Sequence, residues 1–463
     1  MPVRHTFISH RGIHFRQWLI SFMCYRKKCG FLGALLLSAC QTYTPLALHR
    51  QTDFADLKVS ARSLGGQQLP AYVITPGQAL DLTALELLAV SHNPGLTELR
   101  ATLQVHEVEL IAAGLLPDPV YAGGRDHPIS GPDQATAWNN SLMLDTGALI
   151  QHHAQRQAAQ AEQRSIRLDL LWQEWKVLSD VRQRAYRLQA SRNNQALLAA
   201  KARIYQHLCM LQTTALQQHN VSRTQVMDSE QHWQAAQSAL LEARAQQQRS
   251  QQALLSLLGL SPDRSLTITT LPPVHTVPEA PDHLLQRPDL LALQMGYTSA
   301  DAHLRQAILA QFPDLSIGFN DSMDTTSNHT LGFAVQLPLP FFRNNQTALH
   351  KAQVTREQVK IQYQEHLNAA VREISFLKKQ MVSLQRQVDL AITAQHQQCD
   401  AADRWSALLA QHRIDLVNFS TTQVACLDGQ LQVLHWQQEL EQQQLALMTL
   451  QGIVPQWDSL AHA

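Results

Sequence analysis

The sequence contains an internal duplication whose two copies are offset by about 193 residues. At this offset, apolar residues, glycines and prolines coincide along much of each copy. The coinciding pairs include Leu178 with Val371, Val221 with Ile414, Leu254 with Leu447, Gly259 with Gly452 and Pro262 with Pro455. A period this long is the size of a domain and exceeds the repeat unit of a solenoid. The chain is therefore expected to fold as two similar units with the same order of elements.

Each copy opens with a helix that ends at prolines and is followed by two short strands. The helices are predicted at 82–116 and 285–311, because the prolines that follow cannot continue a helix. Alternating apolar and polar residues then predict strands on either side of a polar loop. These strands are 120–124 and 141–145 in the first copy, and 315–319 and 331–337 in the second. They place β-hairpins at about 118–147 and 314–340.

A helix of unusual length follows each hairpin. Apolar residues recur every three or four positions through 148–217 and 345–410, which is the spacing of a coiled-coil seam. A helix of that length is roughly 100 Å long, far more than a compact domain needs. Breaks at 218–222 and 411–416 end these helices, and a shorter helix then returns toward Leu258 or Leu450. The chain is thus predicted to be mainly α, with a small β part.

The composition excludes several classes of function. The chain has 463 residues, only 16% of them charged, and equal numbers of acidic and basic residues. That balance argues against a nucleic-acid partner, which normally requires a basic surface. No nucleophile motif, glycine-rich phosphate loop or metal-ligand spacing is present, so we expect no enzyme activity, no cofactor and no metal site. The 22 histidines are scattered, and we interpret them as solvated or packing residues.

The cysteines of the long helices have no recognisable pattern. Cys209, Cys399 and Cys426 lack CxxC or Cys/His ligand spacing, so neither a zinc site nor a disulfide framework is indicated. We interpret them as small apolar helix residues.

The N-terminal region is typical of an exported protein. Arg26, Lys27 and Lys28 precede an apolar run at 29–37, which is the pattern of a secretory signal and too short to span a membrane. The segment ending at Cys40 resembles a bacterial lipobox, which implies cleavage of residues 1–39 and lipidation of the Cys40 thiol. The alternative is an ordinary signal followed by a chance cysteine. Beyond it we assign an N-terminal segment (40–81), a first repeat (82–262), a Pro-rich connector (263–281), a second repeat (282–455) and a tail (456–463).

The number of strands constrains what a single chain can build. Four strands cannot close a transmembrane barrel, for which eight is about the smallest size. An open sheet cannot cross a bilayer either, because its edge N–H and C=O groups would have no partners. If these strands lie in a membrane, several chains must share one barrel. Three chains would supply twelve strands.

The sequence resembles the TolC-type outer-membrane factor family, in particular its lipoprotein, heavy-metal-efflux branch. The resemblance covers nearly all of the chain after residue 80. Its most specific stretch runs from Leu337 through Pro338, Pro340 and Phe341 to Gln346, and Asn93-Pro94 and Arg287-Pro288-Asp289 also carry it. It implies a homotrimer with a 12-stranded β-barrel in the outer membrane and an α-barrel in the periplasm. Such channels are conduits that work with a periplasmic adaptor and an inner-membrane pump, surrounded by outer-membrane lipid.

The resemblance also implies where the functional residues lie. The two helical breaks would form a periplasmic tip that narrows the pore and docks the adaptor. The matching docking positions are Val221, Ser222, Arg223, Ile414, Asp415 and Leu416. The candidates for a pore gate are Gln225, Asp228, Asn418 and Thr421. Some relatives have an acidic ring after the second break, but Asn418 and Thr421 do not reproduce it.

Three alternatives stay open for the tip. Asp228 could form a ring of carboxylates that attracts cations, or it could be a solvated helix-surface residue. Asp415 and Arg223 could pair between neighbouring hairpins and hold the tip closed. Family members commonly have glycine where His219 and His412 stand, so the turn geometry is an open question.

Two further interpretations concern the aromatic residues and the class of protein. Tryptophans on the long helices are interpreted as packing residues, whereas Trp138, Phe319, Phe333, Phe341 and Phe342 are candidates for an interfacial belt. The alternative to a channel is a periplasmic adaptor or a structural coiled-coil lipoprotein. That alternative shares the lipobox and the helices, but it does not account for hairpins at equal places in both copies.

Overall fold

The computed structural model describes most of the chain beyond residue 78. The described ranges are 79–132, 135–274, 281–312, 314–338, 345–411 and 413–452, with residues 45, 52 and 54 and four short strands between Lys58 and Val73. The chain divides into two units, Met1–Asp53 and Phe54–Ala463, and every element below belongs to the second. The predicted signal segment, the lipidation site Cys40 and the tail 456–463 lie outside the described residues.

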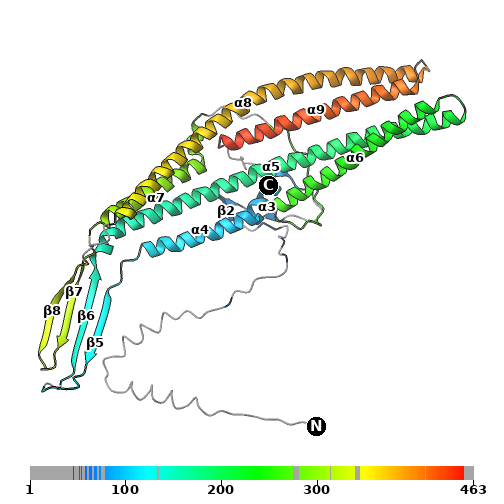
Figure 1. The fold of residues 1–463 in the computed structure, drawn as a ribbon. Coiled ribbons are helices and arrows are strands. Elements are labelled where there is room, and N and C mark those ends of the chain that lie inside the picture. The colour runs from blue at the N-terminus through cyan, green and yellow to red at the C-terminus, as the bar shows by residue number, and fades with distance from the viewer. Residues whose placement is uncertain are drawn as a thin grey trace, which may run out of the picture. The chain divides into compact units, whose positions relative to one another are not determined.

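The two repeats contain the same series of elements (Figure 1). The first comprises α3 (Leu82–His92), α4 (Pro94–Ala113), β5 (Val120–Asp126), β6 (Ala137–Asp145), α5 (Thr146–Gln217) and α6 (Arg223–Leu257). The second comprises the 3-10 helix η1 (Pro281–Gln286), α7 (Pro288–Leu309), β7 (Ser316–Met323), β8 (His329–Gln336), α8 (Gln346–Ala410) and α9 (Leu416–Leu450). The predicted long helices are confirmed, with 72 residues in α5 and 65 in α8.

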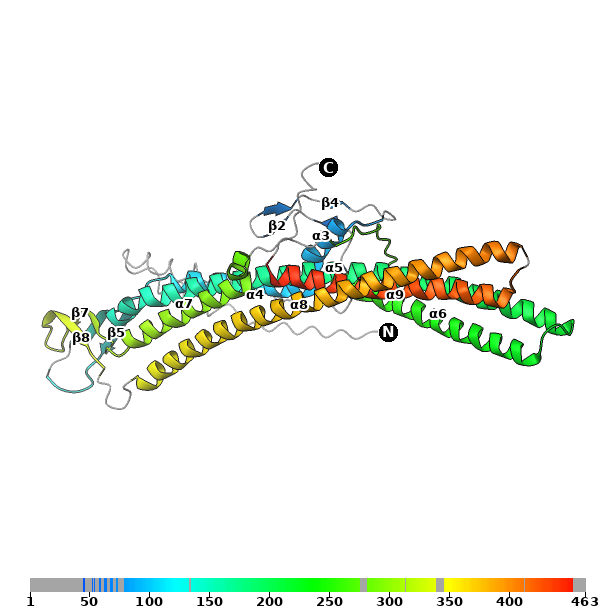
Figure 2. The ribbon, with the colours of Figure 1, turned by 90° about the horizontal axis from the view of Figure 1, so that it is seen from above.

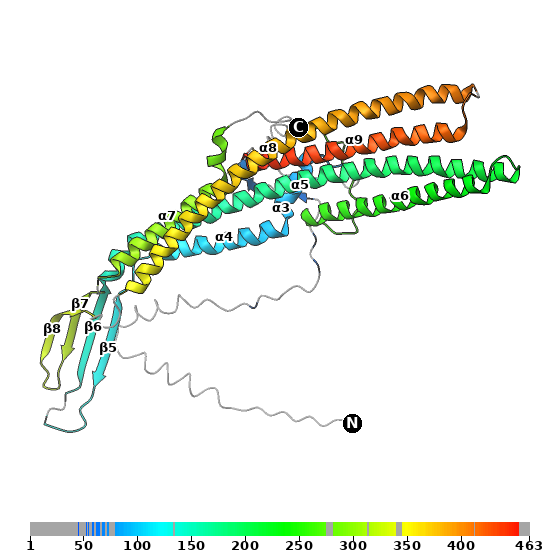
Figure 3. The ribbon, with the colours of Figure 1, turned by 45° about the horizontal axis from the view of Figure 1, so that its top comes forward.

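The arrangement within this unit follows from the two long helices. The hairpin of α5 and α6 and the hairpin of α8 and α9 run side by side, and both turns lie at the end opposite the sheet (Figures 1 and 3). Nearer the sheet, α4 packs on α5, α5 on α7, and α7 on α8. The same helices are seen from above in Figure 2. Both hairpins therefore start from one sheet and end at one tip.

The four strands of the hairpins form a single antiparallel sheet in the order β5-β6-β7-β8. The two hairpins join through β6 and β7, whose paired residues run from Trp138 with Met323 to Asp145 with Ser316. Hydrogen bonds from the backbone N–H and the side-chain Oγ1 of Thr146 to the carbonyl of Leu315 continue this junction into the start of α5, at 2.9 and 2.5 Å. The β-hairpins of the two repeats thus form one continuous sheet.

The predicted strand boundaries were wrong at the end away from the helices. β5 and β6 extend through 125–126 and 137–140, and β7 and β8 through 320–323 and 329–330, all of which had been assigned to loops. These added residues are largely polar, so the apolar alternation stops before the ladder does. The loop after β7 is short because the Asp324 carboxylate accepts hydrogen bonds from the Thr326 and Asn328 backbone N–H groups, both at 2.9 Å.

The first helix of each repeat is also more broken than predicted. The expected helix 82–116 is divided at Asn93 into α3 and α4, and the expected helix 285–311 starts only at Pro288, after η1. The cause in both cases is a proline, which disfavours helical geometry in the residue before it. Four additional short strands pair as Lys58–Val59 with Tyr72–Val73 and Arg62–Leu64 with Gln67–Leu69, and no prediction had placed strands there.

The residue before each of these prolines joins the two ends of its repeat. The Asn93 side-chain amide donates to the carbonyl of Leu257 at 2.9 Å, and the Arg287 guanidinium donates to the carbonyl of Leu450 at 3.1 Å. Leu257 and Leu450 are the last residues of the returning helices α6 and α9, so both bonds satisfy carbonyls that have no partner within the helix. The two copies thus close in the same way with different side chains.

Arg287 makes the more elaborate of these closures. Its guanidinium binds both carboxylate oxygens of Asp289, at 3.0 and 2.6 Å, and lies 4.7 Å from the centre of the Trp172 ring. Arg287 is buried. Trp172 is therefore a packing residue, as the sequence had indicated.

The main hydrophobic core lies beside the middle of α5, where α3 and the connector between the repeats pack together. It contains leucines of α3, α5 and the end of α6, together with Leu260 just after α6, and the connector adds Leu266, Ile268 and Leu271. Leu80, just before α3, pairs with Ile268 of the connector through an isolated parallel β-bridge. The connector is irregular, as expected from its prolines, but its apolar residues belong to the core.

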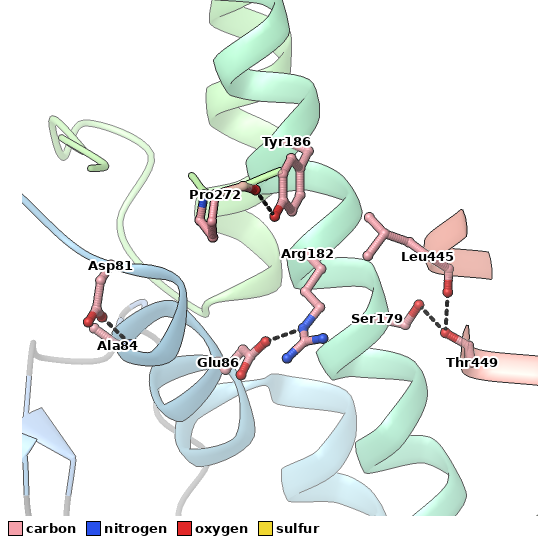
Figure 4. A network of polar contacts seen from close by, with 9 residues as sticks. All are labelled: Asp81, Ala84, Glu86, Ser179, Arg182, Tyr186, Pro272, Leu445 and Thr449. Atoms are coloured by element: carbon pink, nitrogen blue, oxygen red, sulfur yellow. Dashed lines mark hydrogen bonds and ion pairs between the residues drawn. The ribbon is translucent and has the colours of Figure 1, made fainter. Parts of the chain in front are cut away.

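A buried ion pair fixes α3 to α5 within this core (Figure 4). The Arg182 guanidinium of α5 donates to the Glu86 carboxylate of α3, whose side chain is only 2% exposed. Nearby, the Tyr186 hydroxyl donates to the carbonyl of Pro272 at 2.6 Å, and the Thr449 hydroxyl donates to Ser179 at 2.6 Å. Burial raises the pKa of Glu86 above its ordinary value of 4.5, and Arg182 partly opposes that rise.

Replacing the arginine of this pair is expected to make stability depend more strongly on pH. Because Glu86 has a raised pKa in the folded protein, folding takes up a proton above pH 4.5, and stability declines as the pH rises through that window. Arg182→Met removes the charge that lowers this pKa, so we expect a loss of about 3–5 kcal/mol at pH 8 and a smaller loss at pH 5. Thermal unfolding of the detergent-solubilised protein at both pH values measures this difference.

Two variants serve as controls for this measurement. Glu86→Gln combined with Arg182→Met removes the titrating group and should abolish the difference between the two pH values. Arg305→Met removes an exposed arginine from Asp301, which keeps its second partner Arg356, so the change should cost about 0–1 kcal/mol at either pH. A loss for Arg182→Met that is equal at pH 5 and pH 8 would contradict the assignment.

Candidate functional site: the helical tip and the amphipathic sheet

The turn between α5 and α6 is closed by hydrogen bonds at both helix ends. The Asn220 N–H donates to the carbonyl of Ala215 at 2.9 Å, and the His219 N–H donates to the carbonyl of Leu216 at 3.0 Å. These two bonds form a Schellman motif, which requires a left-handed residue after the helix. His219 occupies that position with φ of 61°. Histidine therefore adopts here the conformation for which glycine is the usual residue.

A capping box starts α6 on the other side of this turn. The Gln225 N–H donates to the Ser222 hydroxyl at 3.3 Å, and the Ser222 N–H donates to the Gln225 side-chain oxygen at 2.9 Å. This reciprocal pair satisfies two N–H groups that the helix itself leaves free. Ser222 and Gln225, predicted for docking and gating, thus have a structural role in the turn. Val221 is half-buried and Arg223 is exposed.

The second turn is built on the same plan. The Arg413 N–H donates to the carbonyl of Leu408 at 3.0 Å, which matches the bond from Asn220 in the first turn. Asp415 caps α9, because its carboxylate accepts from the Asn418 backbone N–H at 2.7 Å and from the Asn418 side-chain amide at 3.0 Å. Ile414 and Leu416 are half-buried beside it. His412 lies outside the described residues.

The remaining gate candidates face solvent in the single protomer. Asp228 is exposed, and its carboxylate lies 3.8 Å from the His232 ring on the same helix. His232 stacks on Tyr205 of α5, with ring centres 5.3 Å apart, and burial raises the pKa of the Tyr205 phenol. The Thr421 hydroxyl donates to the carbonyl of Val417 at 2.9 Å. Asp415 is bound to Asn418, so the alternative of a pair between Asp415 and Arg223 stays a prediction about neighbouring hairpins.

The two hairpins of the tip are linked by a salt bridge. The Lys201 ammonium of α5 lies 2.6 Å from the Asp428 carboxylate of α9. Both side chains are accessible to solvent, so the bond is one that can break and re-form.

The interpretation of the helix cysteines was wrong for two of the three. Cys399 of α8 and Cys426 of α9 form a disulfide, with Cα atoms 4.6 Å apart, whereas Cys209 is a buried free thiol. The spacing of the cysteines along the chain gave no sign of this bond. What brings them together is the turn between α8 and α9, because the two residues stand at similar distances on either side of it.

In its half nearer the helices the sheet has one apolar and one polar face, whereas the next row on the apolar side contains Asn140 and Asp321. Residues directly paired across strands point to the same face, so the register groups Tyr121, Leu142, Phe319 and Phe333 into one row. Leu144, Ile317 and Val335 form the neighbouring row on that face. The opposite face carries small and polar residues, with Ser141, Asn320 and Gly332 in one row and Asn139, Ser322 and Thr330 in another.

The aromatic belt candidates separate into two positions on the apolar face. Phe319 and Phe333 contact each other edge to face in the middle of the strands, with ring centres 6.0 Å apart, so they lie within the sheet rather than at its ends. Trp138 is at the far end, where its ring lies 4.9 Å from that of His329. Phe341 and Phe342 lie outside the described residues.

In the described part of the chain, no group of three histidines, cysteines or acidic residues is placed to hold a metal ion.

None of the described helices combines the length and the apolar character that crossing a membrane would require.

Two long helical hairpins rising from a four-stranded antiparallel sheet define the protomer fold of the TolC-type outer-membrane channels. The chain is similar to the outer-membrane channel CmeC of Campylobacter jejuni, at 15% identity and a TM-score of 0.67 over 80% of this chain and 85% of that one. It is also similar to the open state of the outer-membrane channel MtrE of Neisseria gonorrhoeae, at 15% identity and a TM-score of 0.66 over 89% and 98% of the two chains.

A third similar structure is the outer-membrane protein VceC of Vibrio cholerae, at 17% identity and a TM-score of 0.66, covering 80% of this chain and 96% of that one. No protein-family model and no curated protein matches the sequence. At these identities the likeness shows the fold, and the mainly helical prediction with its four strands is confirmed.

Weakening the cap of the first turn is expected to loosen the tip locally. Ser222→Ala removes one half of the capping box and should cost about 1 kcal/mol of helix stability. Amide hydrogen exchange should then become faster at 223–226 and stay unchanged in the core around Leu188. The exposed Ser222 makes no contact with the main core, so slower exchange, or faster exchange in the core, would contradict this role.

Proposed function

We propose that the protein is one protomer of an outer-membrane efflux channel and that three copies form a passive conduit across the outer membrane and the periplasm. The observation that carries the proposal is the amphipathic sheet with its two free edges. In the described structure β5 and β8 each pair on one side only. In a bilayer these edges must find partners, because lipid cannot hydrogen-bond to backbone groups.

Closure between copies satisfies both edges at once. When β8 of one copy pairs with β5 of the next, three copies give twelve antiparallel strands, an even number within the range of outer-membrane barrels. The apolar rows of Phe319 and Phe333 then face lipid, and the row of Ser141 and Asn320 faces the water-filled interior. The antiparallel order of the sheet makes the two edges compatible, since β5 and β8 run in opposite directions.

The helices offer matching edges below the sheet. In the order α4-α5-α7-α8, the outer members are α4, which leads into β5, and α8, which follows β8. Both expose apolar side chains: Val105, Val108 and Ile111 on α4, and Val354 and Ile361 on α8. Contact between α4 of one copy and α8 of the next would bury these residues and extend the barrel into a helical tube.

The remaining parts of the proposal rest on the sequence and on the shared fold. The tip, with Val221, Arg223, Ile414 and Leu416, would dock a periplasmic adaptor that couples the channel to an inner-membrane pump. Lipidation of Cys40 would anchor the chain to the outer membrane. The conduit would pass metal cations or small toxic compounds that the pump selects, and a ring of three Asp228 carboxylates would favour cations.

A pair of variants on neighbouring residues of β7 tests which face meets lipid. Phe319→Arg places a charge on the apolar face and should cost about 2–4 kcal/mol if that face lies in the bilayer. We expect loss of the detergent-resistant trimer from outer-membrane fractions. Asn320→Arg places the same charge on the polar face and should leave the trimer intact while changing the ion selectivity of single channels. Assembly of both variants alike, or recovery of the native chain as a soluble monomer, would contradict the barrel.

Transport itself is tested in a deletion strain. We expect the strain to be more sensitive to metals, dyes or antibiotics than its parent, and the native gene to restore resistance. The gene carrying Phe319→Arg should fail to restore it. Equal sensitivity of deletion and parent strains to all three classes would remove the support for efflux.

A further inference from the structure

Near the tip, the two helices of the first hairpin and the two helices of the second are held together by different kinds of contact. Cys399 and Cys426 join α8 to α9 about three helical turns from the second turn. At the duplicated offset, the first hairpin has Gln206 and Trp233 in these places. There α5 and α6 are held by the apolar contacts of Leu198, Ala202, Ala236 and Leu240 and by the stacking of Tyr205 on His232. Only the second hairpin is cross-linked in the described structure.

The backbone around the disulfide is arranged for close approach of the two helices. Gly429 of α9 lies against Gln395 of α8 so closely that a Cβ at this glycine would come within 3.1 Å of the Gln395 Cα. A larger residue at 429 would force the helices apart. The noncovalent cluster of this hairpin, Leu384, Val388 and Leu440, lies farther from the turn. The cross-link therefore holds a part of the hairpin that this cluster does not reach.

We propose that the Cys399–Cys426 disulfide is an oxidative cross-link that makes the tip ends of α8 and α9 one rigid element. A covalent bond prevents the two helices from separating or sliding in register. Near this height, the solvent-accessible Lys201–Asp428 salt bridge links the second hairpin to α5. The covalent restraint therefore acts within the second hairpin and not between the hairpins.

The cross-link requires export to an oxidising compartment. Disulfides persist in the periplasm and are rare in the cytosol, where thiols are kept reduced. In the forming reaction, one cysteine thiolate attacks the disulfide of an oxidised dithiol carrier, and the second thiolate then displaces the carrier from the mixed disulfide. The two protein thiols give up two electrons and two protons in total, and the carrier takes up both electrons and, through solvent, two protons to leave as a dithiol. The consequence for a pore rests on the proposed channel function, but the cross-link itself does not.

The test compares the two duplicated segments in the same molecule. The full-length chain is isolated from outer-membrane fractions, and amide hydrogen exchange is measured before and after reduction with a phosphine. We expect exchange to accelerate by about tenfold at 399–410 and 416–426. The matched segments 206–217 and 223–233 should not change. Cys399→Ala with Cys426→Ala should show the fast exchange without reductant, and Cys209→Ser should behave as the native chain.

Each outcome of this test decides the proposal. Peptide mapping without reduction should recover the Cys399 and Cys426 peptides joined, and recovery of both as free thiols would overturn it. Unchanged exchange after reduction, or equal acceleration in both hairpins, would also overturn it. If the exchange responds as expected but the chain forms no conducting trimer, the proposed channel function is wrong, whereas the proposed stiffening of α8 and α9 by the disulfide is supported. Reducing an assembled channel avoids any dependence on how the double variant folds.

Discussion

Backbone hydrogen bonding at the edges of the sheet is the constraint on which the rest of the architecture depends. β5 and β8 pair on one side each within the described chain, and a bilayer provides no donor or acceptor for the other side. In the proposed trimer, pairing between copies would satisfy these edges and would also set the position of the helices. Because β5 follows α4 and β8 precedes α8, any closure of the sheet brings α4 of one copy toward α8 of the next.

The duplication explains how one chain supplies two similar hairpins, and the differences between the copies show where they diverge. Asn93 and Arg287 both bind the last carbonyl of the returning helix. Arg287 brings a charge into a buried place and therefore needs Asp289 and Trp172 beside it. Near the tip the divergence is greater, since one hairpin relies on packing and the other on a disulfide. The closing contact is similar in the two copies, whereas the contacts that hold each hairpin together near the tip differ.

The sequence predicted the helices better than it predicted the strands or the disulfide, for physical reasons. The long helices have continuous apolar seams and end at turns whose hydrogen bonds are local, so α5 and α8 were placed within two residues of their observed bounds. The strands lose their alternation where polar residues are consecutive, as at Asn139-Asn140 in β6 and Asn320-Asp321 in β7. Pairing across strands, which local patterns do not report, decides the boundary there.

The disulfide could have been found from the same helical prediction. Once a turn is placed at 411–416, Cys399 and Cys426 fall at similar distances before and after it, and antiparallel helices bring such positions close together. The spacing rules for cysteines concern short loops and metal ligands, so they miss a pair that only a long hairpin brings together. The position of the turn and the positions of the two cysteines predict the bond only when they are considered together.

The caps at the tip narrow the choice of residues that can act on a permeating ion. The Gln225 side chain accepts a hydrogen bond from the Ser222 N–H, and the Asn418 side chain donates one to the Asp415 carboxylate. The side chains of these two gate candidates therefore stabilise the turns. Asp228 lies beyond the first turn of α6 and is exposed, and its carboxylate is 3.8 Å from the ring of His232. In the proposed trimer, a charged side chain that does not cap a helix is free to interact with ions in the pore. Asp228 is therefore the gate candidate whose removal would change ion selectivity without changing the turn that carries it.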